Sequence, residues 1–269
     1  MLHLFQKIVN DTGLTNPNYI SNAFNEYFCN IGPNLAKNLN PPKTGFVHYC
    51  HSPIKNSMYC KPVQSSEIID IVSHFNINKS AGPDSIGPKL LKRVVNELVD
   101  PLQFIYNLSF STASVPSKLK ISKVIPVYKK GVAEDPCNYR PISLLSIFEK
   151  ILEKLMYNRM YDFLNKHEIL YKYQFGFRKN HSTVLALVEM IDNLYNNIDN
   201  NNVTVGVYLD LQKAFDTVDH NILLYKLNVY GIRGLVLDWF RDYLSDRKQF
   251  VALADATSDL MAVTHGVSQ

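Results

Sequence analysis

The sequence is poor in cysteine and has no long apolar run. Its 269 residues include four cysteines and no Cys-x-x-Cys pair, which is too few for a disulfide framework. A reducing compartment inside the cell, the cytoplasm or the nucleus, is therefore expected. No apolar stretch reaches the roughly 18 residues of a transmembrane helix, and the N-terminal residues are too polar and charged for a secretory signal. We expect neither a membrane nor a disulfide-linked protein among the partners.

Charge is also scarce. Charged residues make up 19% of the chain and hydrophobic residues 46%, a balance typical of a folded protein and not of a disordered tail. Lys and Arg total 28 against 24 Asp and Glu, a net charge of +4. This mild excess permits a polyanionic partner without requiring one. The length is sufficient for a buried core in one large domain or two small ones.

One group of residues has the chemistry of a zinc site. His48, Cys50, His51 and Cys60 are of the types that bind zinc most often. Their spacing matches no common zinc module, and the flanking residues are rich in Pro, Ser and Tyr. We therefore favour ordinary loop residues over a zinc site.

Apolar residues recur at helical spacing along much of the chain. Ser65 or Ser66 is expected to cap one helix, Pro88 to occupy the first turn of another, and Asp219 or His220 to cap a third. The predicted helices cover about residues 20–31, 65–75, 88–95, 101–110, 147–164, 183–198, 221–230 and 235–244.

A basic stretch covers residues 118–131, with several lysines and no acid. Within it, residues 123–128 are expected to form a short strand, at a sheet edge because Pro126 cannot donate a backbone hydrogen bond. A polar loop, 131–138, leads to a second extended segment, 139–142. These features predict a β-hairpin with a basic tip.

The segment Val203–Asp210 alternates apolar with other side chains, which is typical of a strand that packs one face on helices. Gly206, on the other face, would let a ligand or another chain approach. Asp210 would then lie at the carboxyl end of a strand, where α/β folds place metal ligands and phosphoacceptors. Mg²⁺ prefers one or two carboxylates together with phosphate oxygens. The alternative is that Asp210 caps a turn.

Two further acids follow, Asp216 and Asp219. Both lie where a loop becomes a helix, and acids there accept hydrogen bonds from free backbone N–H groups. We therefore favour capping over catalysis for both. The chemistry best suited to Asp210 is two-metal nucleotidyl transfer, in which one ion activates a 3′-hydroxyl and the other holds the triphosphate.

Five stretches occur in the order found in reverse transcriptases of non-LTR (LINE-type, jockey-like) retrotransposons, and the chain from Ser65 to Gln269 resembles that family. Leu209–His220 resembles motif A, and Gly266–Gln269 resembles the opening of motif B. Ala23–Phe28 is similar to the stretch that precedes the polymerase in these elements. Lys79–Asp84 resembles the entry motif of the family. Val124–Gly131 with Asn138–Leu144 resembles its fingers hairpin. Gln174–Arg178 with His181–Thr183 resembles the insertion before motif A.

The resemblance implies an RNA-directed DNA polymerase (reverse transcriptase), a nucleotidyltransferase with a two-metal site. Asp210 corresponds to the metal-binding aspartate, with the carbonyl of Leu211 as a further ligand of Mg²⁺, or of Mn²⁺ as the alternative. Phe215 corresponds to the bulky residue under the incoming sugar that selects deoxynucleotides; an ordinary core aromatic is the competing interpretation. Gln269 corresponds to the motif B glutamine near the nucleotide.

The same resemblance assigns basic residues to phosphates. Lys129 or Lys130, together with Arg140, corresponds to the cations that hold the triphosphate. A solvated lysine pair is the alternative, whereas Arg140 is suited to a bidentate phosphate contact. The cations that would lie along template or primer phosphates are Lys118, Lys120, Lys123, Arg178 and Lys179. An RNA template, a DNA primer and dNTPs are the partners implied for the complete enzyme.

We expect an α+β fold: the fingers and an incomplete palm of a right-hand reverse transcriptase, with a helical N-terminal region. The predicted divisions are an N-terminal extension of linker type over residues 1–64, a helical part of the polymerase region over 65–117, and the fingers with the first part of the palm over 118–269.

The sequence departs from the family where it stops at Gln269, in motif B. The Ala-Asp-Asp of motif C, the thumb and an upstream endonuclease are absent from it, and one carboxylate does not complete a two-metal site. We therefore expect a truncated polymerase, inactive as an isolated chain, with the edge beside Val203–Asp210 unpaired. The alternative is a non-catalytic nucleic-acid-binding remnant or a pseudogene-derived fragment.

Overall fold

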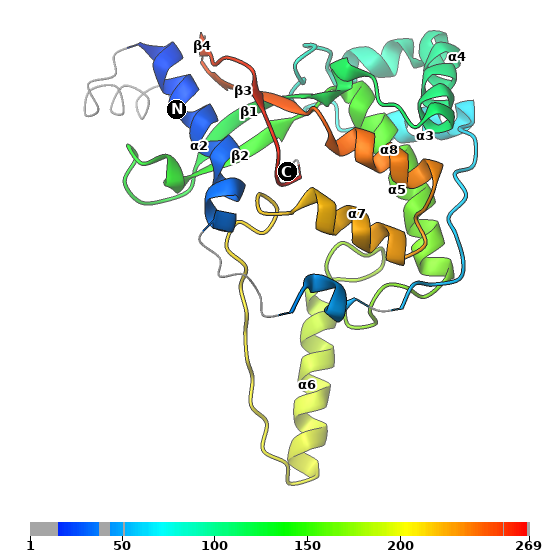
Figure 1. Cartoon of the computed structure of the whole chain (residues 1–269), viewed down its shortest axis with the longest axis vertical. Helices are drawn as coiled ribbons and strands as arrows, with labels where there is room; N and C mark the ends of the chain where they lie inside the picture. Colours follow the sequence, from blue (N-terminus) through cyan, green and yellow to red (C-terminus); the bar gives the residue numbers. More distant parts are fainter. Residues whose placement is uncertain (1–15, 38–43, 51, 255, 268–269) are drawn as a thin grey trace. The chain divides into compact units, whose positions relative to one another are not determined.

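A computed structural model describes residues 16–37, 44–50, 52–254 and 256–267. The chain divides into two compact units, one formed by residues 1–160 and 213–269 and the other by residues 161–212. Figure 1 labels the helices and strands in chain order. The boundaries between these units lie near residues 160 and 213. The divisions expected at residues 64 and 117 therefore remain predictions.

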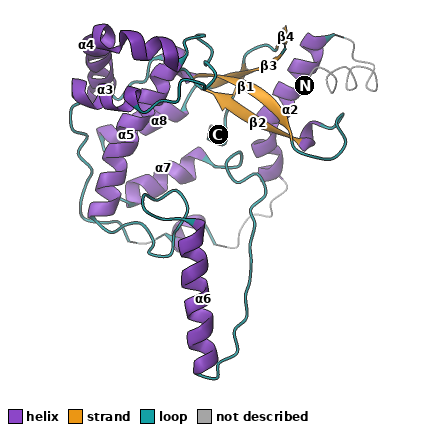
Figure 2. Ribbon diagram, turned by 180° about the vertical axis from the view of Figure 1, so that it is seen from behind, coloured by secondary structure: helices purple, strands orange, loops and turns teal. Residues whose placement is uncertain are grey.

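The first unit contains a mixed five-stranded sheet (Figure 2). The predicted hairpin is confirmed, because β1 and β2 pair antiparallel along residues 123–128. β3 lies parallel to β1, and both β4 and β5 pair antiparallel with β3. The main path is β2-β1-β3-β4. The strands are β1 (Ile121–Tyr128), β2 (Tyr139–Leu144), β3 (Lys248–Leu253), β4 (Ala256–Thr257) and β5 (Met261–Ala262).

The edge position predicted from Pro126 is wrong for β1, because β1 has a neighbour on each side. Its pairing with β3 covers only residues 121–124 and stops before Pro126, which has no N–H to donate. On the other side Pro126 lies opposite Pro141 of β2, and two prolines can face each other only at a pair that exchanges no hydrogen bonds. The proline therefore limits the parallel ladder without placing the strand at an edge.

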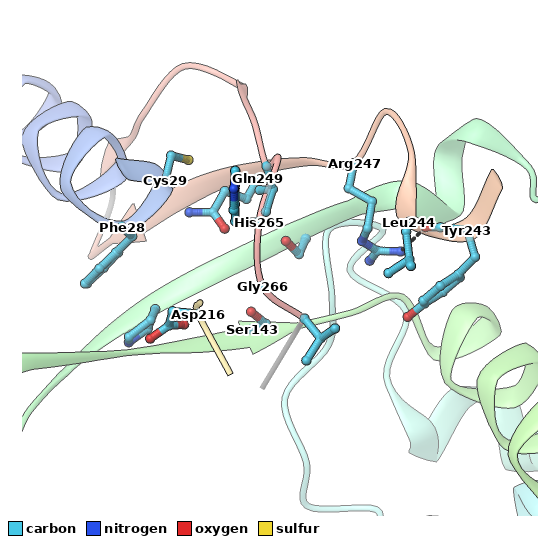
Figure 3. Close-up of a pocket in the computed structure, with 14 residues that line it drawn as sticks. Phe28, Cys29, Ser143, Asp216, Tyr243, Leu244, Arg247, Gln249, His265 and Gly266 are labelled. Carbon is cyan, nitrogen blue, oxygen red and sulfur yellow. Dashed lines mark hydrogen bonds between the residues drawn. The ribbon is translucent and has the colours of Figure 1, made fainter. Parts of the chain in front are cut away.

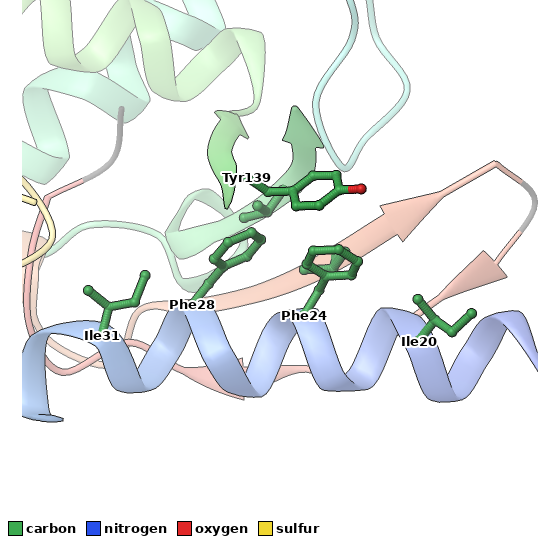
Figure 4. Close-up of a cluster of buried hydrophobic side chains, with 7 residues drawn as sticks. Ile20, Phe24, Phe28, Ile31 and Tyr139 are labelled. Carbon is green, nitrogen blue, oxygen red and sulfur yellow. The ribbon is translucent and has the colours of Figure 1, made fainter. Parts of the chain in front are cut away.

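Helix α2 (Pro17–Lys37) packs on this sheet and confirms the helix predicted over residues 20–31. Its apolar side chains recur every three or four residues, which brings them to one face. Figure 4 shows this face against the sheet. The buried cluster consists of Ile20, Phe24, Phe28 and Ile31 from α2 with Val124, Tyr139 and Val251 from the three longest strands. Residues 17–37 therefore form part of the hydrophobic core of the first unit.

The remaining helices follow the sequence signals closely. Gln64 caps α3 through reciprocal bonds with Glu67, in place of the serines expected there, and Asp219 caps α7 as expected. None of the described helices is long and apolar enough to cross a membrane. The helices are α3 (Ser65–Ser73), α4 (Pro88–Thr112), α5 (Ile147–Lys166), α6 (Thr183–Asp199), α7 (His220–Val229) and α8 (Leu235–Leu244), with 3-10 turns η1 (Phe46–Tyr49), η2 (Ser117–Lys120) and η3 (Pro136–Asn138).

Helix α4 is one continuous helix where the sequence predicts two. Pro101 lies inside it and removes one backbone hydrogen bond, but the buried positions before and after the proline, from Leu91 to Phe110, belong to the same helix. Trp239 of α8 is buried near the end of α4 and its Nε1 donates to Ser109 Oγ at 3.0 Å. Packing along the whole length therefore outweighs the local cost of the proline.

In the second unit, the helix predicted over residues 183–198 is confirmed as α6, capped by Ser182. The strand predicted over Val203–Asp210 is wrong, since these residues are extended but pair with no strand among those described. Val203 is 93% exposed and Leu209 is 89% exposed, so the expected apolar face is not covered either. An extended segment becomes a strand only when a neighbour satisfies its backbone N–H and C=O groups.

Candidate functional site

The hairpin of β1 and β2 carries the exposed cations Lys129, Lys130 and Arg140. The backbone N–H of Lys129 donates to the carbonyl of Asn138 at 2.8 Å and closes the hairpin. Arg140 lies directly opposite Val127, so the two side chains share the exposed face of the hairpin. No ion pair involving these three cations is found within the described part of the chain. The hairpin therefore presents three unpaired positive charges to solvent.

The cations before the hairpin differ from one another. Lys118 is exposed and Lys123 is half-buried. Lys120 is only 6% exposed, and its Nζ lies 2.9 Å from Oδ2 of Asp242. The predicted contact of Lys120 with template or primer phosphate is therefore wrong for this structure, because the ammonium group is buried and already paired.

The motif A residues after Gln212 and the first motif B residues lie side by side in the first unit. Gly266 donates its backbone N–H to the carbonyl of Val218 at 2.9 Å, and Val267 donates to the carbonyl of Phe215 at 3.0 Å. Nε2 of His220 lies 2.7 Å from the carbonyl of Gly266. The structure thus joins the loop that carries Phe215 to the segment that precedes Gln269, although Gln269 itself lies outside the described residues.

A small cavity of about 60 Å³ lies beside this loop (Figure 3). Its wall includes Phe28 and Cys29 of α2, Ser143 of β2 and Gln249 of β3. Asp216 also faces it and does not cap α7, so the capping predicted for Asp216 is wrong. Burial raises the pKa of the Asp216 carboxyl, an effect that Lys213 partly opposes. The cavity therefore brings an acidic side chain next to the motif A and motif B backbone.

A buried ion pair, which the sequence analysis missed, supports the far side of the cavity. Arg247 lines the cavity, and its Nη2 donates to Oε1 of Glu149 at 2.6 Å. Its guanidinium also lies over the ring of Tyr243, 4.8 Å from the centroid. Burial raises the pKa of Glu149 to about 7 although Arg247 opposes this shift. The only signal in the sequence is a glutamate at a buried position of α5, among Ile151 and its apolar neighbours.

The second unit holds the other predicted site residues. Asp210 and Leu211 are exposed. Nη1 of Arg178 donates to the carbonyl of Tyr171 at 3.1 Å, and Nζ of Lys179 lies 5.0 Å from the ring centroid of Tyr161. Asp210 thus belongs to the second unit, whereas Phe215 and the cations of the hairpin belong to the first.

The donor chemistry at the end of the second unit suits a hard cation. The carboxylate of Asp210 and the carbonyl of Leu211 supply oxygen atoms only, as Mg²⁺ and Mn²⁺ prefer. Within the described ranges, no group of three or more His, Cys, Asp or Glu side chains is placed to hold a metal ion. The residues therefore fit Mg²⁺ as part of a ligand set and not as a complete one.

The sequence model of the family described as reverse transcriptase (RNA-dependent DNA polymerase) matches residues 127–269, more than half of the chain. The chain belongs to this family. Its expected kinship with polymerases of jockey-like non-LTR retrotransposons is confirmed by two relatives from Drosophila melanogaster.

The probable RNA-directed DNA polymerase from transposon BS is 31% identical over 225 residues, which cover 81% of this chain and 24% of the relative. The RNA-directed DNA polymerase from mobile element jockey is 28% identical over 222 residues, which cover 82% of this chain and 24% of the relative. The chain thus spans about a quarter of the length of these relatives. The region that the family model matches begins at residue 127, near the end of β1, and includes β2 and the Phe215 loop.

Proposed function

We propose that this chain supplies the fingers and the first part of the palm of an RNA-directed DNA polymerase acting by two-metal nucleotidyl transfer, in the cytoplasm or the nucleus. The observation that carries the proposal is the junction between the Phe215 loop and Gly266–Val267 in a chain of this family. This junction joins the motif A residue assigned to the sugar with the segment that leads to the motif B glutamine. The predicted divisions at residues 64 and 117 are part of the same proposal.

The chemistry follows from the residue types. Asp210 and the carbonyl of Leu211 would hold Mg²⁺, which when bound activates the 3′-hydroxyl and neutralises the triphosphate. The fork of Arg140 binds phosphate oxygens in pairs, and Lys129 or Lys130 adds a point charge. The ring of Phe215 packs under the incoming sugar and excludes a 2′-hydroxyl. These residues orient the nucleotide, and orientation together with electrostatic stabilisation accounts for most of the catalysis in phosphoryl transfer.

Template and primer would be held through their phosphates. Lys118, Lys123, Arg178 and Lys179 have the charge for such contacts, which are independent of base sequence and weaken as salt rises. Gln269 would lie near the incoming nucleotide.

The test is binding of a poly(rA)/oligo(dT) template–primer to the purified chain, followed by fluorescence anisotropy over a range of KCl concentrations. Alanine at Lys118, Lys123 and Lys179 together removes three of the proposed template or primer phosphate contacts, so the slope of log affinity against log salt should fall by about 2. The matched control removes three exposed cations elsewhere, Lys55, Lys89 and Arg93, and should leave most of the slope in place.

The second arm measures dissociation of the template–primer with Mg²⁺ and a nucleotide. The complementary dTTP should slow dissociation more than dGTP, because only dTTP pairs with the template while the site holds its triphosphate. Salt-dependent binding with no difference between dTTP and dGTP would contradict the polymerase proposal and favour a non-catalytic nucleic-acid-binding protein. Absence of binding at low salt would contradict both.

A further inference from the structure

Gly32 of α2 touches the backbone of the Phe215 loop. A Cβ built on Gly32 would lie 2.4 Å from the carbonyl oxygen of Asp216 and 2.8 Å from Cβ of His265. Both distances are shorter than real Cβ contacts, so no larger residue fits at this position without movement of the loop. Helix and loop therefore meet backbone to backbone, although they come from distant parts of the sequence.

A second glycine touches the same peptide of the loop. A Cβ on Gly266 would lie 2.9 Å from the carbonyl oxygen of Phe215 and 2.9 Å from Cα of Asp216, and the φ of Gly266 is +80°. The Phe215–Asp216 backbone is thus in close contact with α2 and with the first motif B residues. Gly32 and Gly266, from distant parts of the sequence, both approach the carbonyl oxygen of Asp216, which would lie 2.4 Å and 3.0 Å from a Cβ built on each.

The contact can position the loop because α2 is itself held on the sheet. Asn25 is fully buried, and its Nδ2 donates to the carbonyl of Asp259 at 2.9 Å and to that of Gln249 at 3.3 Å. Gln249 returns a bond from Nε2 to Oδ1 of Asn25 at 3.1 Å. The helix is therefore locked to β3 both by hydrogen bonds and by its apolar face.

We propose that α2 is a positioning element of the nucleotide site, and that Gly32 is the contact through which it sets the place of Phe215. This inference rests on the proposed function, in which Phe215 distinguishes deoxynucleotides from ribonucleotides. It assigns a role to residues 17–37, far upstream of the region from residue 127 that the family model covers. Gly32 acts through the loop and does not itself touch the nucleotide.

The glycine has a competing explanation in the next residue. Pro33 lies inside α2, and a residue before proline is disfavoured in helical conformation unless it lacks a Cβ. The test is therefore made in a Pro33→Ala background, with and without Gly32→Ala. If Gly32 only accommodates Pro33, alanine at both positions should strengthen the helix, because alanine is the better helix former.

The readout is hydrogen exchange by mass spectrometry in peptides that cover residues 213–218 and 263–267. We expect exchange there to be roughly tenfold to a hundredfold faster in the double variant than in Pro33→Ala, because the loop must move to admit the methyl group. Exchange in β1 and β2 should stay unchanged. Equal or slower exchange in the loop, or the same acceleration in β1 and β2, would overturn the proposal.

The unaltered chain gives an independent check that needs no variant. In native-state exchange at rising urea concentration, amides of residues 28–32 and of residues 213–218 should open together with the same urea dependence. Separate opening of the helix and the loop would count against the proposal even if the double variant failed to fold.

Nucleotide discrimination provides the functional readout. We measure the half-saturating concentrations of UTP and dUTP on the template–primer complex. Their ratio, UTP over dUTP, should fall toward 1 in the double variant, while affinity for the template–primer stays the same. An unchanged ratio alongside faster loop exchange would mean that α2 positions the loop without setting Phe215, against the proposal. If no nucleotide affects the parent chain, the proposed function fails, and the exchange experiment still decides whether α2 positions the loop.

Discussion

Asn25→Ala tests directly whether α2 belongs to the folded polymerase unit. The side chain of Asn25 is fully buried and forms three hydrogen bonds with Gln249 and Asp259. Alanine removes all three bonds and leaves Nε2 of Gln249 without this partner in the buried interface, whereas the carbonyl of the exposed Asp259 still accepts from Ser258 Oγ. Each loss costs about 1 kcal/mol, while the higher helix propensity of alanine returns about 0.5 kcal/mol.

We therefore expect the free energy of unfolding to fall by about 2.5 kcal/mol, which lowers the melting temperature by roughly 5–10 °C in a unit of this size. Thermal and urea unfolding followed by circular dichroism measure both quantities. The matched control is Asn30→Ala on the same helix, where the side chain bonds only the exposed carbonyl of Glu26 and the expected change is within about 0.5 kcal/mol. Equal stabilities of the two variants would refute the packing of α2 on β3.

Three further predictions concern the cavity and its surroundings. Burial raises the pKa of Glu149 from 4.5 to about 7, so the folded state keeps this proton to higher pH than the unfolded state does. The free energy of unfolding should therefore fall as the pH rises from 4.5 to about 7 and level off above that. In Glu149→Gln the urea midpoint should change less over this pH range, and an equal change with pH in both proteins would contradict the burial argument. Gly266→Ala should cost about 1–3 kcal/mol because of its positive φ and the nearby carbonyl, whereas Gly45→Ala, with nothing within 4 Å, should be neutral; equal urea midpoints would argue against the contact. Lys120→Ala should lower the free energy of unfolding by about 1–2 kcal/mol through loss of its partly screened ion pair and leave the salt slope of RNA binding unchanged. Lys118→Ala should leave the free energy of unfolding unchanged and lower the salt slope. A lower salt slope in Lys120→Ala would show that Lys120 contacts phosphate after all.

Signals that act over a few residues predicted the fold well. Helical spacing of apolar residues located α2, α5, α6, α7 and α8, because one stripe of apolar side chains suffices to indicate a helix. The hairpin of β1 and β2 was likewise predicted from two short extended runs around a polar loop. The local cost of Pro101 predicts a break in the helix, whereas packing on both sides of the proline keeps α4 continuous.

Contacts between distant residues could not be predicted. The partners Arg247 and Glu149 are 98 residues apart, and no periodicity relates the residue before β3 to a residue of α5 at that separation. The sequence does not indicate the contact of Gly32 either, because the following Pro33 is by itself a sufficient local explanation for a glycine at this position. The alternation in Val203–Asp210 is a real strand signal, but a strand also requires a neighbour, which a local pattern does not supply.

The candidate site was predicted in part. The resemblance assigned Phe215 and Gln269 to the same nucleotide, and in the structure Val267, two residues before Gln269, donates its backbone N–H to the carbonyl of Phe215. The burial of Lys120 was missed because composition shows a run of lysines without showing which of them turns inward. The roles assigned to Asp210, Lys129 and Arg140 remain predictions.

The measurement that tests the central claim most directly is the Mg²⁺-dependent effect of dTTP on the poly(rA)/oligo(dT) complex in Asp210→Asn. Asp192→Asn is the matched control, an exposed aspartate on α6 in the same unit. The account predicts that dTTP with Mg²⁺ slows dissociation in the parent chain and in Asp192→Asn, and that Asp210→Asn abolishes this effect while binding the template–primer as tightly. A dTTP effect that survives in Asp210→Asn would contradict the assignment of the metal-binding carboxylate and, with it, the proposed nucleotidyl-transfer site.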